Sequence, residues 1–195
     1  MPTTSAVESA FVSKIRADLT HRFPTAANAE KAGYRRFSNE DETGAISYVN
    51  LHWVSTDPKL PAQLWYDVKG RLIGADYSVL QRDHPSAPAL FGVNPARLQK
   101  IGAHVHYVRK NADGSLTYDL AVGAKKWAAA GLNLAHPTAA GLVKVGAVKS
   151  TADVDFVFLY PSIWDLGVWL VPNSNGPFAD SNPNVQPSKP APSSP

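Results

Sequence analysis

Apolar residues recur every four positions near the beginning of the chain, and this spacing predicts an amphipathic helix over residues 6–22. Its apolar stripe consists of Val7, Phe11, Ile15 and Leu19. Ser5 and Glu8 have the spacing of a capping box, which favours a helix start at this point. Thr25 can cap a second, shorter helix that ends near Ala32, so the first part of the chain is predicted to be helical.

From residue 44 onward the period of the apolar residues changes to two, which is typical of half-buried strands. The predicted strands cover residues 46–54, 64–68, 71–80, 101–110, 115–122, 154–160 and 163–171. Turn residues at Lys69-Gly70 and at 111–114 predict two hairpins, and Pro161-Ser162 is predicted to join the last two strands. A short helix is expected over residues 124–130.

Helices followed by sequential strands favour an α+β fold. We therefore expect two N-terminal helices followed by a mainly antiparallel β-meander that curls into a half-open or closed barrel. The expected single globular domain covers residues 1–184, with a helical part at 5–33 and a β-rich part at 44–172. Residues 185–195 are mainly Pro and Ser, and they are expected to form a disordered tail because they offer little apolar surface to bury.

The net charge of +3 is concentrated in the helical part of the chain. Residues 1–36 carry six basic and three acidic side chains, and the remaining residues carry thirteen of each. Because this is no concentrated basic stripe, we expect no nucleic-acid partner. No stretch reaches the roughly 18 apolar residues of a membrane-spanning helix, and no Gly-rich phosphate loop is present, so neither a membrane span nor a nucleotide cofactor is expected.

Six histidines and no cysteines restrict any metal site to nitrogen and oxygen ligands. His104 and His106 alternate along a predicted strand, so both imidazoles are expected on one face, roughly 7 Å apart along the strand. Two neighbouring imidazoles on a strand are a common beginning of a transition-metal site. The same pair can instead line a polar cavity or face water without any metal.

A metal site of this kind needs further ligands from other parts of the chain. His52 is the first candidate, because it lies on the predicted strand 46–54. Asp76 is a candidate carboxylate, since a charged side chain in the middle of a strand requires a partner. His84, on the Pro-rich loop after that strand, is a candidate to complete the site. The donor set leaves Zn, Cu, Fe, Ni and Mn open as the divalent ion.

The aromatic residues permit a second hypothesis, a metal-free β-barrel-like module that binds a small apolar or aromatic ligand. Its pocket would be lined by Trp65, Tyr66, Tyr77 and Trp169. Packing alone also explains large aromatic residues in a small β-structure. Under these two hypotheses the partner is a small molecule or a metal ion, and the sequence leaves open whether the protein is an enzyme. A third hypothesis is a structural or interaction protein that uses the basic N-terminal helices or the Pro-rich tail.

Short motifs spread over most of the chain carry a resemblance. They are Ala32-Gly33-Tyr34, Leu51-His52-Trp53-Val54, Leu64-Trp65-Tyr66-Asp67, Leu72–Tyr77, Ala89–Gly92, Asp165–Trp169, Asn175–Ala179 and Asn182–Val185. Together they resemble a widespread family of uncharacterised, often exported, single-domain bacterial proteins. The resemblance implies a periplasmic or secreted mature form without its signal peptide, leaves a cytoplasmic location open, and implies no activity.

Overall fold

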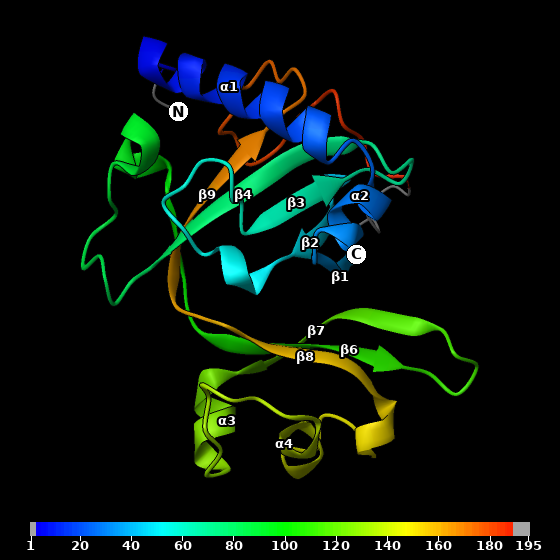
Figure 1. The fold of residues 1–195 in the computed structure, drawn as a ribbon. Coiled ribbons are helices and arrows are strands. Elements are labelled where there is room, and N and C mark those ends of the chain that lie inside the picture. Colours follow the sequence, from blue (N-terminus) through cyan, green and yellow to red (C-terminus); the bar gives the residue numbers. More distant parts are fainter. Residues whose placement is uncertain (1–2, 189–195) are drawn as a thin grey trace, which may run out of the picture. The chain divides into compact units, whose positions relative to one another are not determined.

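The chain has an α+β fold with two antiparallel sheets, and each sheet packs against a hydrophobic core of its own (Figure 1). The computed structural model describes residues 3–188. Unit 1 is built from the residues up to 100 and from 164 onward, and unit 2 from residues 101–163. The domain predicted over residues 1–184 therefore contains two compact units, each with its own core.

Unit 1 combines helices with a six-stranded sheet. The helices are α1 (Ala6–Arg22), α2 (Ala26–Lys31) and the short 3-10 helices η1 (Leu51–Trp53), η2 (Leu90–Gly92) and η3 (Pro95–Arg97). The strands, in their order across the sheet, are β1 (Arg35–Glu40), β2 (Ile46–Val49), β3 (Gln63–Tyr66), β4 (Leu72–Leu80), β9 (Ile163–Trp169) and β5 (Gln99–Ile101). The helix α1 lies across one face of this sheet (Figure 1).

The local signals at the start of the chain are confirmed. The Ser5 hydroxyl accepts from the backbone N–H of Glu8, and the Glu8 carboxylate accepts from the backbone N–H of Ser5. The predicted stripe is wrong at its first position, because Val7 is 57% exposed and Val12 is buried in its place. The buried face is thus centred on Phe11, Val12, Ile15 and Leu19, which lie on one side of a helix.

The strand predicted over residues 46–54 is shorter in the structure, and this changes the surroundings of His52. β2 ends at Val49, because the Asn50 side chain caps the following 3-10 helix. Its Oδ1 accepts from the backbone N–H of His52 at 3.2 Å. His52 therefore lies on η1 and is exposed, whereas the sequence predicted it on a strand.

The last two predicted strands exist but do not pair as a hairpin. β8 (Val154–Tyr160) belongs to the three-stranded sheet, whereas β9 belongs to the six-stranded sheet beside β4. The Ser162 hydroxyl, between the two strands, accepts from the backbone N–H of Ala103 at 3.1 Å. Within residues 3–188 the strands thus form two sheets and no closed barrel, so the α+β class is confirmed and the predicted barrel is not.

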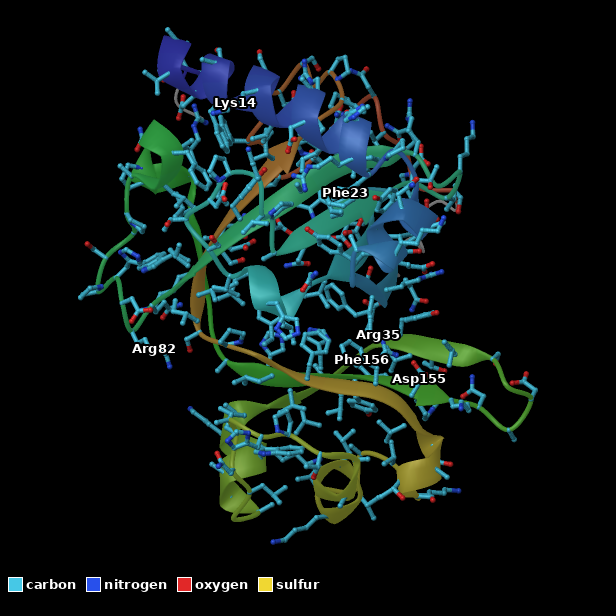
Figure 2. The ribbon with its side chains drawn as sticks, viewed as in Figure 1. Lys14, Phe23, Arg35, Arg82, Asp155 and Phe156 are labelled. Carbon is cyan, nitrogen blue, oxygen red and sulfur yellow. The ribbon has the colours of Figure 1, made fainter. Side chains whose placement is uncertain are left out.

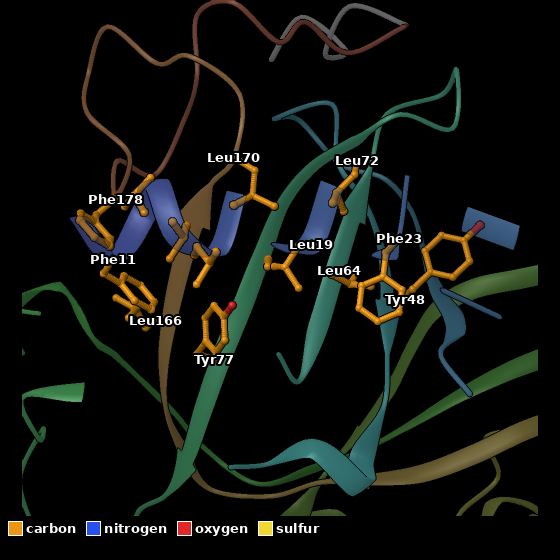
Figure 3. Packing of buried hydrophobic residues seen from close by; sticks show 14 of the residues in the cluster. Phe11, Leu19, Phe23, Tyr48, Leu64, Leu72, Tyr77, Leu166, Leu170 and Phe178 are labelled. Atoms are coloured by element: carbon orange, nitrogen blue, oxygen red, sulfur yellow. The ribbon is translucent and has the colours of Figure 1, made fainter. Parts of the chain in front are cut away.

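The core of unit 1 lies between α1 and the sheet. Phe11 and Leu19 of α1 pack in one cluster with Leu64, Tyr77 and Leu166 of the strands (Figure 3). Full burial of one such side chain stabilises the fold by roughly 1.5–3 kcal/mol. This core therefore fixes β4 and β9, and with them the side chains that point to the opposite face of the sheet.

A buried ion pair fastens α1 to η3. Arg97 Nε donates to Glu8 Oε1 at 2.7 Å, and Arg97 Nη2 donates to Glu8 Oε2 at 3.2 Å. The two side chains are 4% and 2% exposed, and the Arg97 guanidinium lies over the ring of Phe178, 4.7 Å from its centroid. One ion pair thus links the N-terminal helix, η3 and the C-terminal segment.

Unit 2 is a three-stranded sheet with helices on one face (Figure 1). Its elements are β6 (His104–Lys110), β7 (Leu116–Gly123), α3 (Ala124–Ala129), α4 (Ala139–Lys144), η4 (Thr151–Asp153) and β8, with β6 between β7 and β8. The predicted hairpin of β6 and β7 and the short helix after it are confirmed. Val105 and Tyr107 of β6 pack with Trp127 and Leu142 of the two helices.

The C-terminal segment contacts unit 1 beyond the predicted domain boundary at residue 184. Val185 belongs to a buried cluster, and Ser188 donates from its backbone N–H and its hydroxyl to the carboxylate of Glu40. Of the tail predicted as disordered over 185–195, residues 189–195 lie outside the described residues.

Candidate functional site

His104 and His106 lie on one face of β6, as their alternation predicts. Val105 and Tyr107 point into the core of unit 2, so the two histidines project from the opposite face of the strand. Their ring centroids are 4.7 Å apart, and the planes meet at 61°. The two imidazoles are therefore direct neighbours.

A hydrogen bond fixes the tautomer of His104. Its Nδ1 lies 2.8 Å from the carbonyl oxygen of Gly102. Because a carbonyl oxygen only accepts, Nδ1 carries the hydrogen, and the lone pair of the neutral ring is on Nε2. A histidine that donates one ring N–H to a backbone carbonyl is the usual arrangement of a metal ligand, since it orients the other nitrogen.

His106 is a neutral imidazole at neutral pH. Burial, together with the neighbouring His104, lowers the pKa of His106 to about 4. A hydrogen bond with the backbone of Leu120 acts in the opposite direction, as expected when a ring N–H donates to a carbonyl. The neutral form is the one that binds metals.

Aromatic rings of β8 support both histidines, and these rings were not among the site residues predicted from the sequence. In the antiparallel register His104 faces Tyr160 and His106 faces Phe158. His104 stacks on Tyr160 at 4.8 Å between centroids, and His106 stacks on Phe158 at 5.5 Å. Phe156 stacks on Phe158 at 5.0 Å and extends the row. These three aromatic residues alternate along one strand in the sequence, and that pattern predicts an aromatic face.

The other predicted metal ligands, His52, Asp76 and His84, all belong to unit 1, whereas His104 and His106 belong to unit 2. The backbone oxygen of His84 accepts from Trp164 Nε1 at 2.9 Å, so the loop that carries His84 is fastened to β9. Within the described part of the chain, no three His, Asp or Glu side chains form a group that could hold a metal ion.

Asp76 has the buried partner that its position in the middle of a strand requires, and this partner is Asp165 of β9. Trp65 Nε1 donates to Asp76 Oδ2 at 2.7 Å, and the Ser78 hydroxyl donates to Asp165 Oδ1 at 2.5 Å. Burial raises the pKa of both carboxyl groups, and the charge on Asp165 raises that of Asp76 further. A hydrogen bond between the two side chains also raises the pKa of Asp76, which lies well above its ordinary value.

Two glycines make room for the indole that covers this carboxyl pair. A Cβ at Gly74 would lie 2.0 Å from Trp65 Cε3, and one at Gly167 would lie 3.0 Å from Trp65 Cη2. The Trp65 ring also packs edge-on against Trp169, with 5.3 Å between centroids. Asp76 is hydrogen-bonded to Trp65 and paired with Asp165, so its side chain has a structural role within unit 1.

The four residues of the predicted aromatic pocket are divided between two clusters. The structure brings Trp65 and Trp169 together with Ile73, whereas Tyr66 and Tyr77 belong to the core beneath α1. The Tyr66 hydroxyl donates to the carbonyl of Phe23 at 3.0 Å, and that of Tyr77 to the carbonyl of Pro58 at 2.8 Å. Trp169 Nε1 donates to the carbonyl of Ala179 at 2.7 Å. These side chains are packed and hydrogen-bonded within unit 1.

No protein-family model, curated protein or solved structure matches this chain. The resemblance to a family of exported bacterial proteins stays a prediction. In residues 3–188, no helix combines the length and the hydrophobicity that a membrane-spanning segment requires.

Proposed function

We propose that His104 and His106 bind one divalent transition-metal ion. The observation that carries the proposal is the hydrogen bond from His104 Nδ1 to the carbonyl of Gly102, because it leaves Nε2 as a fixed donor beside a second neutral imidazole. Two nitrogens that share one ion at about 2.1 Å each lie at most about 4.2 Å apart. The ring centroids of His104 and His106 are 4.7 Å apart, so the two imidazoles are direct neighbours on one face of β6.

The donor set narrows the choice of ion. Imidazole suits Zn, Cu, Fe and Ni, whereas Mn favours carboxylate ligands. Asp76, the carboxylate considered from the sequence, is engaged with Trp65 and Asp165, so we leave it out of the proposed ligand set. His52 and His84 belong to unit 1, so we leave them out of the proposed ligand set as well, and water or a substrate completes the coordination.

The test is calorimetric titration of untagged protein with Zn²⁺ and Cu²⁺ at neutral pH, because a histidine tag would itself bind both ions. We expect one ion per chain for the wild type and loss of binding in the double variant H104A/H106A. His136 is exposed in unit 2, so H136A is the matched control and is expected to bind normally.

Two results would overturn the proposal. One is binding well below one ion per chain in the wild type. The other is equal binding by wild type and H104A/H106A, which would place the ion elsewhere.

A further inference from the structure

A second place with the features of a binding site lies in unit 1, between α1 and the segment that follows β9. It is a hollow of about 270 Å³. It is lined by Thr4, Ser9, Val12, Ser13, Arg16, Val171, Asn173 and Pro177. Four of these side chains carry hydroxyl or amide groups, one is a guanidinium, and none is acidic.

Arg16 is held in position by the backbone. Its Nε donates to the carbonyl oxygen of Leu170 at 2.6 Å, at the end of β9. This bond uses one of the five donors of the guanidinium and leaves the two Nη groups, whose fork geometry matches a carboxylate or a phosphate. The guanidinium is therefore oriented before any ligand arrives, which lowers the entropic cost of binding.

The charge of Arg16 is not neutralised within residues 3–188. Other arginines of unit 1 pair with acids: Arg22 with Asp18 at 2.5 Å, and Arg97 with Glu8 at 2.7 Å. Arg16 lies on the same helix as Asp18 but has no such partner in the described chain. A fixed cation in a hollow without acidic groups favours an anionic ligand.

The remaining lining residues indicate which chemical groups the ligand carries besides its anion. Ser13 lies one turn before Arg16 on the same face of α1, so its hydroxyl can donate to the same anion. Asn173 is already used, since it donates to the carbonyl of Ser181 and accepts from the N–H of Asn175. Val171 and Pro177 supply an apolar wall.

We propose that this hollow binds a small organic anion through Arg16 and Ser13, with the apolar part of the ligand against Val171 and Pro177. The ligand carries a carboxylate or a phosphate, because both accept two parallel hydrogen bonds from a guanidinium. The site is separate from the proposed metal site and does not depend on it.

The test measures binding of benzoate, phenyl phosphate and inorganic phosphate to the full chain by two-dimensional NMR, from the backbone signals of α1 and of residues 170–177. Benzoate and phenyl phosphate distinguish the two anions, and inorganic phosphate measures the anion alone. We expect saturable binding of at least one organic probe, with affinity in the millimolar range or better and with shifts confined to these two segments.

Two variants and a control decide the outcome. R16Q is expected to bind roughly tenfold to hundredfold more weakly, since it loses charge-assisted hydrogen bonds. S13D keeps Arg16 but adds a carboxylate to the hollow, and it is expected to weaken binding as well. Lys14 has an exposed side chain on the same helix, so K14Q is the matched control and is expected to bind normally (Figure 2).

The proposal is overturned if none of the probes binds saturably to the wild type. It is also overturned if S13D and R16Q bind as tightly as the wild type. Equal weakening by K14Q would show that binding depends on the general charge of α1, and that result too contradicts a built site.

Discussion

The buried ion pair between Glu8 and Arg97 makes a quantitative prediction about stability. Glu8 accepts two hydrogen bonds from Arg97 and one each from the backbone N–H groups of Ser5 and Asn94. The bond with Arg97 lowers the pKa of Glu8 to about 2, and the two backbone bonds act in the same direction against the effect of burial. A fall from 4.5 to about 2 corresponds to roughly 3 kcal/mol, at about 1.4 kcal/mol per pKa unit.

The sign of the pH effect follows from linkage. The pKa of Glu8 is lower in the folded chain, so the unfolded chain binds more protons as the pH falls. The stabilisation is complete above the pKa of the unfolded chain, about pH 4.5, and is lost as the pH falls toward 2. The variant E8Q is expected to lose about 3 kcal/mol at pH 7 and to lose less further stability in acid than the wild type.

Urea unfolding at pH 7, 4 and 3 measures these differences directly. Glu30 is exposed on α2, so E30Q makes the same chemical change without a buried partner, and it is expected to stay within about 0.5 kcal/mol of the wild type. R97M leaves the Glu8 carboxylate buried without its cation, and the double variant E8Q/R97M is expected to be more stable than R97M alone. The reasoning is refuted if E8Q matches E30Q at pH 7, or if the acid dependence of E8Q equals that of the wild type.

Two further predictions concern the face of the six-stranded sheet that carries the carboxyl pair. Because burial raises the pKa of Asp76 and Asp165, the folded chain holds a proton that the unfolded chain releases, so stability should decrease as the pH rises above about 4. D76N removes one of the two titrating carboxyl groups, and urea unfolding from pH 5 to 8 should show a flatter profile than the wild type. G74A should lose more than about 2 kcal/mol because its Cβ meets Trp65, whereas nothing lies within 4 Å of a Cβ at Gly123, so thermal unfolding of G123A should be close to that of the wild type.

Local features of the fold were predictable from the sequence, because the residues that determine them are close in the chain. The capping box of Ser5 and Glu8 involves one helical turn, and the common face of His104 and His106 follows from the geometry of any strand. β1 was missed because four of its six residues, in Arg35–Glu40, are charged or amide residues that give no apolar alternation. His52 was assigned to a strand because the capping role of Asn50 is invisible in the alternation of apolar residues.

The pairing of Asp76 with Asp165 could not be predicted from the sequence. The two residues are far apart in the chain, and they meet only because β9 lies beside β4 instead of forming a hairpin with β8. The sequence predicted only that Pro161-Ser162 joins the two strands, and such a short connection usually favours pairing of sequential strands. β8 and β9 lie in different sheets because Leu166 and Val168 of β9 are buried in the core of unit 1. No local sequence pattern predicts this placement.

We propose that His104 and His106 share one metal ion, and the tautomer of His104 is already fixed by its hydrogen bond to Gly102. Two-bond ¹H–¹⁵N correlation of the histidine rings, recorded with and without one equivalent of Zn²⁺, tests it most directly. Before zinc is added, His104 should show a protonated Nδ1, and after addition the Nε2 signal of His104 and one nitrogen of His106 should take the shift of a coordinated nitrogen. A protonated Nε2 on His104 in the free protein, or zinc-induced shifts on His136 and not on these two rings, would contradict the account.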